Sequence, residues 1–196
     1  MEKRQLFDNH NKPLSGPLIL QPDIFRDERG FFFESWNRKI FQETTLKDIN
    51  FVQDNHSYSQ YGTLRGLHFQ VYPEPQAKLV RCIRGEIYDV IVDLRMQSSS
   101  YGHWAGVRLD AINCKQLWIP DGFAHGFLVM SEEAEVIYKV SNYWHSNFER
   151  TLQWNDNEVA IDWPLKAKPK LSLKDLKGLS LSECKNANFF NHFEND

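Results

Sequence analysis

The feature that most constrains the fold of this chain is a series of short apolar or alternating runs that begins at Lys78 and ends near Trp144. The runs are KLVRCI, EIYDVIVDLR, HWAGVRLD, KQLWIP, GFLVMS and EVIYKVSNYW, and turn residues separate them. Runs of this length are typical of β-strands. Strands that follow one another without intervening helices indicate a sandwich or barrel and argue against a βαβ array. The sequence therefore predicts a mainly β fold.

The dipeptide Arg84-Gly85 separates KLVRCI from EIYDVIVDLR, and we predict that these two runs form a hairpin. The second run alternates, with Tyr88, Val90, Val92 and Leu94 on one face and Ile87, Asp89, Ile91 and Asp93 on the other. Upstream, FFFESW, FVQDNHSYS and LRGLHFQ are predicted to be extended, and the DERG turn at 27–30 leads into the first of them. Extended structure is thus expected on both sides of the predicted hairpin.

Helices are expected in only two places. Residues 37–49 place Ile40, Phe41 and Thr44 at helical spacing, and a second, short helix is predicted after Ser172. The polar tail, residues 180–196, is left unassigned. With 196 residues and 41% hydrophobic content, the chain is long enough for one full core, so we expect a single domain over 1–196.

Composition and charge exclude several classes of partner. The net charge of −3 and the pI near 6.2 argue against a nucleic-acid-binding surface, which usually carries a basic excess. The N-terminus has no apolar signal region, and no apolar run approaches the roughly 18 residues that span a bilayer, so no membrane partner is expected. Three cysteines without CxxC spacing fit reduced thiols. These observations predict a cytoplasmic protein.

Two histidines, His68 in LRGLHFQ and His125 in WIPDGFAHGF, lie between glycines and large apolar residues. Each is a candidate core residue, metal ligand or base. The spacing from Pro120 through Gly122 to His125 resembles the second half of the cupin signature. The first half, which supplies a His-x-His pair in metal-binding cupins, has only His68, and two histidines are too few for a tight site unless His56 or Glu74 joins them. We therefore expect no metal.

Without a metal, the neighbours of His68 decide between a core residue and an acid–base group. Arg65 and Lys78 fall on segments predicted to be adjacent to it, which gives two cations beside one possible base. Cations beside a base suit proton abstraction next to a carbonyl, because positive charge stabilises the developing enolate. The same cations would equally bind a phosphorylated ligand without any chemistry. The residues alone leave these two interpretations open.

Eight blocks, FFFESW, FVQDNHS, LRGLHFQ, QAKLVRCIRGEIYDVIVDLR, QLWIPDGFAHGFLV, YKVSNYW, ERTLQWND and IDWPL, resemble in order and spacing the dTDP-4-dehydrorhamnose 3,5-epimerases of the cupin superfamily. The resemblance covers residues 18–178. It implies a cupin-type jelly-roll barrel with a few short helices, a homodimer, and no cofactor. The implied reaction is inversion of C3 and C5 of dTDP-4-dehydro-6-deoxyglucose, a step toward dTDP-L-rhamnose.

The resemblance also implies roles for single residues. His68 matches the general base, Tyr138 the acid on the opposite face, Asp175 the carboxylate that orients the histidine, and Lys78 the cation near the enolate. The positions that match substrate-binding residues are Arg29, Glu34, Gln53, Asp54, Asn55, Arg65, His125, Trp144, Glu149 and Lys174. Among these, Trp144 falls where an aromatic residue stacks on thymine.

Some of these positions have purely structural alternatives. Tyr138 could be an ordinary inward tyrosine of a strand, and Ser172-x-x-Asp175 has the form of a helix capping box. The function has alternatives too, because relatives that epimerise a single centre, C3 or C5, of a related 4-keto sugar nucleotide keep much of the same residue set. A non-catalytic cupin that binds a sugar nucleotide is a further possibility.

Overall fold

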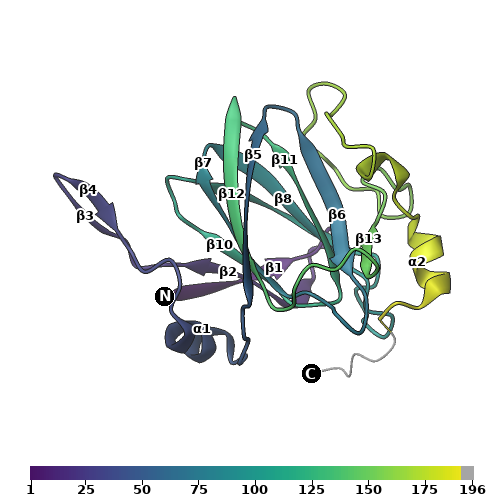
Figure 1. Ribbon diagram of the computed structural model, residues 1–196, viewed down its shortest axis with the longest axis horizontal. Coiled ribbons are helices and arrows are strands. Elements are labelled where there is room, and N and C mark those ends of the chain that lie inside the picture. The colour runs from purple at the N-terminus through teal and green to yellow at the C-terminus, as the bar shows by residue number, and fades with distance from the viewer. Residues whose placement is uncertain (191–196) are drawn as a thin grey trace.

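The computed structural model of the protein describes residues 1–190, and its main body consists of two facing antiparallel sheets (Figure 1). The first sheet has six strands in the order β1 (Glu2–Phe7), β2 (Pro13–Gln21), β10 (Gln116–Ile119), β7 (Lys78–Arg84), β12 (Glu133–Val140) and β5 (Gln53–Gln60). The second has five, in the order β13 (Glu149–Thr151), β6 (Leu64–Gln70), β11 (Phe123–Val129), β8 (Glu86–Asp93) and β9 (Trp104–Asp110). This architecture confirms the predicted mainly β, cupin-type jelly roll.

The main core lies between the two sheets. Val80 and Leu117 from the six-stranded sheet meet Ile91 and Phe127 from the five-stranded sheet, and all four side chains are buried. Each buried side chain of this size contributes about 1.5–3 kcal/mol relative to an exposed one. The core therefore holds the sheets together and fixes which side chains face the space between them.

Strand β8 is covered on both faces. Ile87 and Ile91 belong to the core between the sheets, whereas Val90 and Val92 belong to a second cluster that includes residues from the chain after β13. That later segment crosses the outer face of the five-stranded sheet and ends in α2 (Leu181–Ala187), beside β13 in Figure 1. The predicted alternation along β8 is confirmed.

The predicted hairpin between KLVRCI and EIYDVIVDLR is wrong. Strand β7 pairs with β10 and β12, whereas β8 pairs with β11 and β9, so the turn carries the chain from one sheet to the other. A tight turn between alternating strands looks the same in the sequence whether the strands pair or separate. Gly85 at this turn has φ +73°, and a Cβ there would lie 2.0 Å from the carbonyl oxygen of Glu133, so the tight approach requires glycine.

The helices match the prediction in part. Helix α1 (Arg38–Thr45) begins where Asn37 accepts a hydrogen bond from the Ile40 N–H (3.2 Å), and it ends before residue 49 at Leu46, which is left-handed. The predicted short helix is the 3₁₀ helix η1 (Asp175–Lys177). Helix α2 and the N-terminal hairpin β1–β2 were not predicted, because each offers only a few buried apolar residues within a polar sequence. The tail beyond residue 190 lies outside the described residues.

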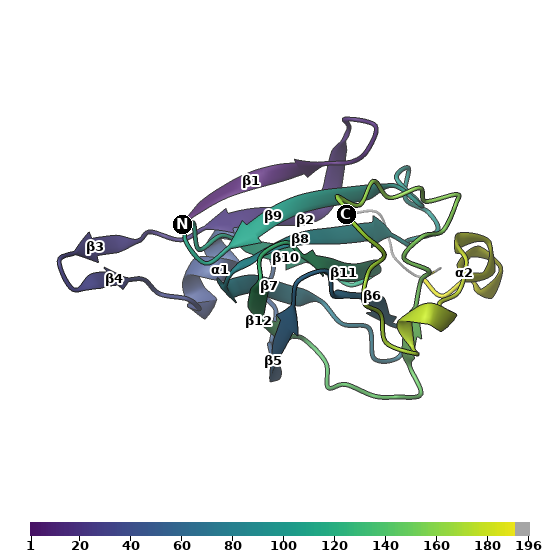
Figure 2. The ribbon, with the colours of Figure 1, turned by 90° about the horizontal axis from the view of Figure 1, so that it is seen from above.

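A two-stranded ribbon, β3 (Phe25–Asp27) and β4 (Gly30–Phe32), projects away from both sheets (Figures 1 and 2). Its turn is the predicted DERG turn, with Asp27 paired to Gly30. Phe25, Phe31 and Phe32 are 66%, 54% and 68% exposed. The ribbon therefore presents apolar surface that this chain does not cover.

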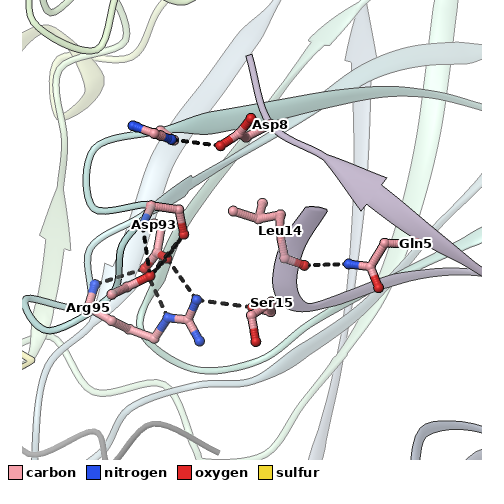
Figure 3. Close-up of polar contacts among 9 residues, drawn as sticks. Gln5, Asp8, Leu14, Ser15, Asp93 and Arg95 are labelled. Atoms are coloured by element: carbon pink, nitrogen blue, oxygen red, sulfur yellow. Dashed lines mark hydrogen bonds and ion pairs between the residues drawn. The ribbon is translucent and has the colours of Figure 1, made fainter. Parts of the chain in front are cut away.

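A polar cluster, which we call the Asp93 cluster, anchors the end of β8 (Figure 3). The fully buried Asp93 accepts hydrogen bonds from Arg95 Nε (2.9 Å) and Nη2 (2.7 Å) and from the hydroxyls of Ser98 and Ser100 (2.7 Å each). Arg95 Nη2 also donates to the Ser15 carbonyl at 3.0 Å. Through these bonds the loop after β8 is tied to β2.

Two further findings concern the described part of the chain. Within residues 1–190, no helix is long and apolar enough to cross a bilayer. Cys82, Cys114 and Cys184 are all buried free thiols, and burial raises the pKa of Cys82 and of Cys184 to about 12. The cysteines are therefore buried thiols whose raised pKa keeps them protonated at neutral pH.

Candidate active site

A cavity of about 240 Å³ lies between the sheets and is walled by residues from both. Of the predicted site residues, its wall contains Asn55, Arg65, His68, Lys78, His125, Tyr138, Trp144, Glu149 and Lys174. Ser57, Gln70 and Gln76 also line it and were not predicted. Residues from six strands and from the segment before η1 thus converge on one space.

His68, on β6, is held by a carboxylate from behind. Its Nε2 lies 2.6 Å from Oδ1 of Asp175, which is 3% exposed. The other oxygen of Asp175 accepts the Ser172 hydroxyl at 2.8 Å, and the Asp175 N–H donates to that hydroxyl at 3.2 Å. Asp175 therefore shares two hydrogen bonds with Ser172 and is bound to His68. The N-cap of η1 is Lys174, without a side-chain cap hydrogen bond, so Ser172 and Asp175 do not form the helix capping box that their spacing suggests.

The surroundings of His68 keep its ring neutral. Burial lowers the pKa of His68, and the positive charges of Lys174 and Lys78 lower it further, while Asp175 opposes the shift through its hydrogen bond and charge. Burial raises the pKa of Asp175, but the hydrogen bonds from His68 and Ser172 outweigh it and hold that pKa below its ordinary value. At neutral pH the pair thus combines a neutral imidazole, able to accept a proton, with an anionic partner that stabilises the product imidazolium.

Lys78, on β7, is buried next to this pair. Its Nζ donates to the carbonyl oxygen of His68 at 3.0 Å, and the residue is 5% exposed. Burial lowers the pKa of Lys78 to about 8, although the charges of Asp89 and Glu149 raise it in part. The ammonium group therefore remains mostly charged at neutral pH, within a low-dielectric site where charge acts strongly.

Tyr138 lies on β12, in the other sheet from His68, and both side chains line the cavity. Burial raises the pKa of Tyr138, and the charge of Glu149 raises it further. The phenol is therefore protonated at neutral pH and can donate a proton. A base on one sheet and an acid on the other place two proton-transfer groups on opposite walls of one cavity.

His125, on β11, is the register partner of His68 on β6. Its Nε2 lies 2.9 and 3.0 Å from the two carboxylate oxygens of Asp89, a fully buried residue of β8. Asp89 was not among the predicted site residues. The sequence did contain a signal, because an acid between Ile87 and Ile91 at an inward position of an alternating strand requires a partner.

At the open side of the cavity, polar side chains form a short network. Gln53 Nε2 donates to Asn55 Oδ1 at 2.8 Å, and the Trp144 N–H donates to Gln53 Oε1 at 3.1 Å. Lys174 Nζ lies 2.8 Å from Glu149 Oε1. Gln53 is therefore a support for two cavity residues, although it does not line the cavity itself. Trp144 is 56% exposed and lines the cavity, so its side chain is accessible to a ligand.

Three predicted residues lie away from the cavity. Asp54 precedes Asn55 on β5 and faces the opposite side of the sheet, where it pairs with Lys139 at 2.8 Å. Arg29 is at the tip of the β3–β4 ribbon and pairs with Asp27, and Glu34, just after the ribbon, accepts from Asn37 Nδ2 at 3.1 Å. The structure of one chain does not bring these residues to the cavity.

Within the described residues, no group of three or more histidine, cysteine, aspartate or glutamate side chains is arranged to hold a metal ion. His56, which could have completed a metal site, bonds Glu135 at 2.9 Å on the exposed side of β5. The histidine–carboxylate pair and the phenol of the cavity are groups that can perform acid–base catalysis.

Fold and site together define a cupin-type jelly-roll protein with a histidine–carboxylate pair opposite a phenol, the equipment of an acid–base isomerase. The protein family described as dTDP-4-dehydrorhamnose 3,5-epimerase matches residues 11–183 of the sequence. The chain belongs to this family.

Relatives and solved structures agree with this assignment. The chain is 53% identical over 161 residues to the dTDP-4-dehydrorhamnose 3,5-epimerase of Shigella flexneri, covering 82% of this chain and 88% of that one. The crystal structure of dTDP-6-deoxy-D-glucose-3,5-epimerase from Legionella pneumophila Philadelphia 1, in complex with dTDP-4-keto-L-rhamnose, is 39% identical and has a TM-score of 0.90. The match covers 98% of this chain and 100% of the Legionella chain. A dTDP-4-dehydrorhamnose 3-epimerase from Streptomyces niveus is 37% identical over 174 residues, 89% of this chain and 84% of that one.

Proposed function

We propose that the protein is a dTDP-4-dehydrorhamnose 3,5-epimerase, which inverts C3 and C5 of dTDP-4-dehydro-6-deoxyglucose in dTDP-L-rhamnose biosynthesis. The observation that carries the proposal is the position of His68 with Asp175 on one wall of the cavity and of Tyr138 on the other. Membership of the family and the ligand in the Legionella structure support the substrate class.

In the proposed mechanism, His68 removes the proton from the carbon next to the C4 ketone. The ketone makes this proton acidic, because the electrons left behind form an enolate, so neither a metal nor a nicotinamide is required. Asp175 stabilises the imidazolium that forms, and the ammonium group of Lys78 stabilises the enolate. Tyr138 then donates its proton to the carbon from the opposite face, which inverts the centre. C3 and C5 flank the same carbonyl, so the same groups serve both when the ring is repositioned.

The size of the cavity indicates which part of the substrate it can enclose. Its volume of about 240 Å³ is below the ~300–1,000 Å³ usual for sites that enclose a drug-sized ligand. The sugar therefore occupies the cavity while the nucleotide extends over its open side. There Trp144 stacks on thymine, and the remaining contacts to sugar, diphosphate and base come from Arg65, His125, Asn55, Gln53, Glu149 and Lys174.

We further propose that the active form is a homodimer in which the β3–β4 ribbon of one chain reaches the cavity of the other. The exposed phenylalanines of the ribbon support an interface. The ribbon also carries Arg29, and Glu34 follows it, and both are predicted to bind substrate although neither reaches the cavity of its own chain. A partner subunit would supply both residues. Asp54 faces away from the cavity and pairs with Lys139, and these contacts give it no role in substrate binding or in the proposed dimer.

A complementation experiment tests this dimer. Mixing inactive Arg29→Ala and His68→Asn proteins should restore about a quarter of the wild-type activity, because half of the dimers are mixed and each has one intact site. The control is a protein that carries both substitutions in the same chain. Its dimers have no intact site, so it should stay inactive. No recovery in the mixture, with dimers exchanging subunits, would show that Arg29 serves its own chain or none.

A single domain in the cytoplasm is proposed as well. The residues after β13 pack on the same sheet that forms the cavity, which supports one domain. Three buried free thiols support a reducing compartment.

Incubation with the keto sugar in deuterated water, followed by NMR of the product, tests the reaction. Label at both C3 and C5 is expected. Label at neither carbon would refute the epimerase, while binding without exchange would indicate a non-catalytic protein. Label at one carbon would instead indicate a single-centre epimerase, the activity named for the Streptomyces niveus relative.

A further inference from the structure

Asp89 is a fully buried carboxylate with one hydrogen-bond donor. Among the described residues that donor is His125 Nε2, which lies 2.9 and 3.0 Å from its two oxygens. A buried carboxylate is costly unless charge and hydrogen bonds compensate it. Asp89 therefore depends on the positive charges around the cavity more than a fully hydrogen-bonded carboxylate would.

Several titratable groups share the cavity with His125. His68 on β6 is its register partner, Lys78 comes from β7, and Glu149 and Lys174 line the same cavity. The negative charge of Asp89 counteracts the effect of burial on Lys78 and favours its charged form. Asp89 is thus one of the anions, with Glu149, that balance the positive charge of Lys78.

The bond to Asp89 also determines which atom of His125 is left for a ligand. Asp89 occupies Nε2, whereas Nδ1 has no hydrogen-bond partner within residues 1–190, and the residue lines the cavity. A carboxylate behind one ring nitrogen fixes both the orientation of the ring and the nitrogen that carries the proton. The arrangement repeats that of Asp175 behind His68, on the neighbouring strand.

We propose that Asp89 is a positioning residue: by holding Nε2 it fixes the His125 ring, so that Nδ1 faces an anionic oxygen of the substrate. Two oxygens have this chemistry: the C4 oxygen that becomes negative when C3 or C5 is deprotonated, and an oxygen of the diphosphate. The predicted effect of Asp89 on the reaction rate rests on the proposed epimerase function. The orientation of the His125 ring by Asp89 does not depend on that function.

Kinetics of Asp89→Asn test the consequence. Exchange of the C3 and C5 protons should fall about 10- to 100-fold, the usual effect of losing such a supporting carboxylate. Because Asp89 acts through His125, the double variant Asp89→Asn/His125→Gln should lose no more than His125→Gln alone. The matched control is Asp8→Asn, whose carboxylate lies 2.6 Å from His103 Nδ1 outside the cavity and should leave exchange unchanged.

Affinity for dTDP separates the two oxygens. A dTDP dissociation constant within about threefold of wild type, with exchange reduced, assigns the contact to the C4 oxygen. A dTDP affinity reduced about tenfold or more assigns it to the diphosphate. Unchanged exchange and affinity, or additive losses in the double variant, would overturn the proposal.

Nitrogen NMR of wild-type protein gives a readout that needs no substrate and no folded variant of Asp89. The His125 signals, assigned by their loss in His125→Gln, should show a protonated Nε2. An Nε2 without a proton would overturn the positioning role. If wild-type protein exchanges no proton at all, the proposed function fails while this measurement still decides the role of Asp89.

Discussion

Two aspartates on the same face of β8, Asp89 and Asp93, are equally buried and serve different ends. Asp93 accepts hydrogen bonds from Arg95, Ser98 and Ser100, so donors from its own chain satisfy both of its carboxylate oxygens. Among the described residues, Asp89 accepts a hydrogen bond only from His125. Burial alone therefore does not distinguish an aspartate with a structural role from one with a functional role. The number of hydrogen-bond donors that the fold supplies to the carboxylate does distinguish them.

The same contrast extends to the regions around them. The Asp93 cluster closes a loop onto β2 and leaves its carboxylate saturated. In the cavity, by contrast, neither the buried Ser57 hydroxyl nor the Tyr138 hydroxyl has a hydrogen-bond partner within residues 1–190. Buried polar atoms without a partner are rare in native proteins. Among the described residues two others, Trp104 Nε1 and Gln116 Oε1, lie outside the cavity, so it is the position of Ser57 and Tyr138 on the cavity wall that makes their hydroxyls available to a ligand.

The largest effect is expected from His68→Asn, which removes the proposed base. The rate of proton exchange at C3 and C5 should fall about 10²–10⁴-fold, the range that general base catalysis supplies. The melting temperature should change little, because the carboxylate of Asp175 keeps its bond to Ser172. NMR of exchange in deuterated water and thermal unfolding measure the two quantities. Wild-type exchange by this variant would refute the assignment of the base.

Tyr138→Phe should separate two steps that His68→Asn abolishes together. Without the phenol, net inversion should fall by about 10²-fold or more, while proton removal at the first centre continues through His68. The ratio of exchanged to inverted product is the measurement. Equal losses of exchange and inversion would contradict the division of roles between the two walls.

Asp93→Asn should have the reverse profile. Loss of the charge leaves Arg95 half-buried without its partner, and we expect about 3 kcal/mol of lost stability. Activity per folded molecule should remain near wild type, because no residue of the Asp93 cluster lines the cavity. Denaturant unfolding and kinetics, compared with those of Asp89→Asn, test the contrast. It breaks down if Asp89→Asn is the less stable variant and Asp93→Asn the less active one.

A smaller effect than those of the substitutions above is expected in the pH dependence of kcat/KM, because two charged or titratable groups of the cavity change protonation with pH. The pKa of His68 lies below its ordinary value of 6.5, so kcat/KM should fall only below that pH, as the base becomes protonated. The pKa of Lys78 is about 8, so kcat/KM should fall about tenfold per unit above that value as the ammonium is lost. Lys78→Arg should remove the alkaline limb. An unchanged limb in that variant would assign it to another group.

Lys78 also has a predicted effect on stability, with a definite sign. Its pKa is about 8 in the folded chain and 10.5 as the ordinary value, so between these values the unfolded chain binds more protons. The contribution of Lys78 to stability therefore increases as the pH rises through this window. Lys78→Met, which has no such titration, is the matched comparison.

The strands and the cavity residues were largely predictable from sequence, whereas the path of the chain between sheets was not. Alternation and turns predicted β8 and its two faces, but they could not show that β7 and β8 belong to different sheets. The difference depends on long-range pairing with β11 and β9, which local pattern does not encode. Helix α2 escaped prediction for a related reason, since Leu181 and Cys184 are its only buried side chains.

For the site, the sequence predicted many of the residues that line the cavity, but not which face of a strand each residue occupies. His68, Lys78, Tyr138 and Trp144 meet in one cavity as expected. Asp54 faces away because successive strand residues alternate, and a motif of neighbouring letters does not distinguish the two faces.

Alternation placed Asp89 on one face of β8, but nothing in the local sequence identified it as a site residue. Its function is visible only once His125 is seen beside it. A buried acid in an alternating strand is therefore a reason to look for a cationic partner elsewhere in the chain.

The most direct test of the account is position-resolved proton exchange by the wild-type protein and by His68→Asn, run side by side in deuterated water with dTDP-4-dehydro-6-deoxyglucose. The account predicts deuterium at both C3 and C5 with the wild-type protein and at neither with folded His68→Asn. Deuterium at both carbons with the two proteins at equal rates, or at neither carbon with wild type, would contradict it.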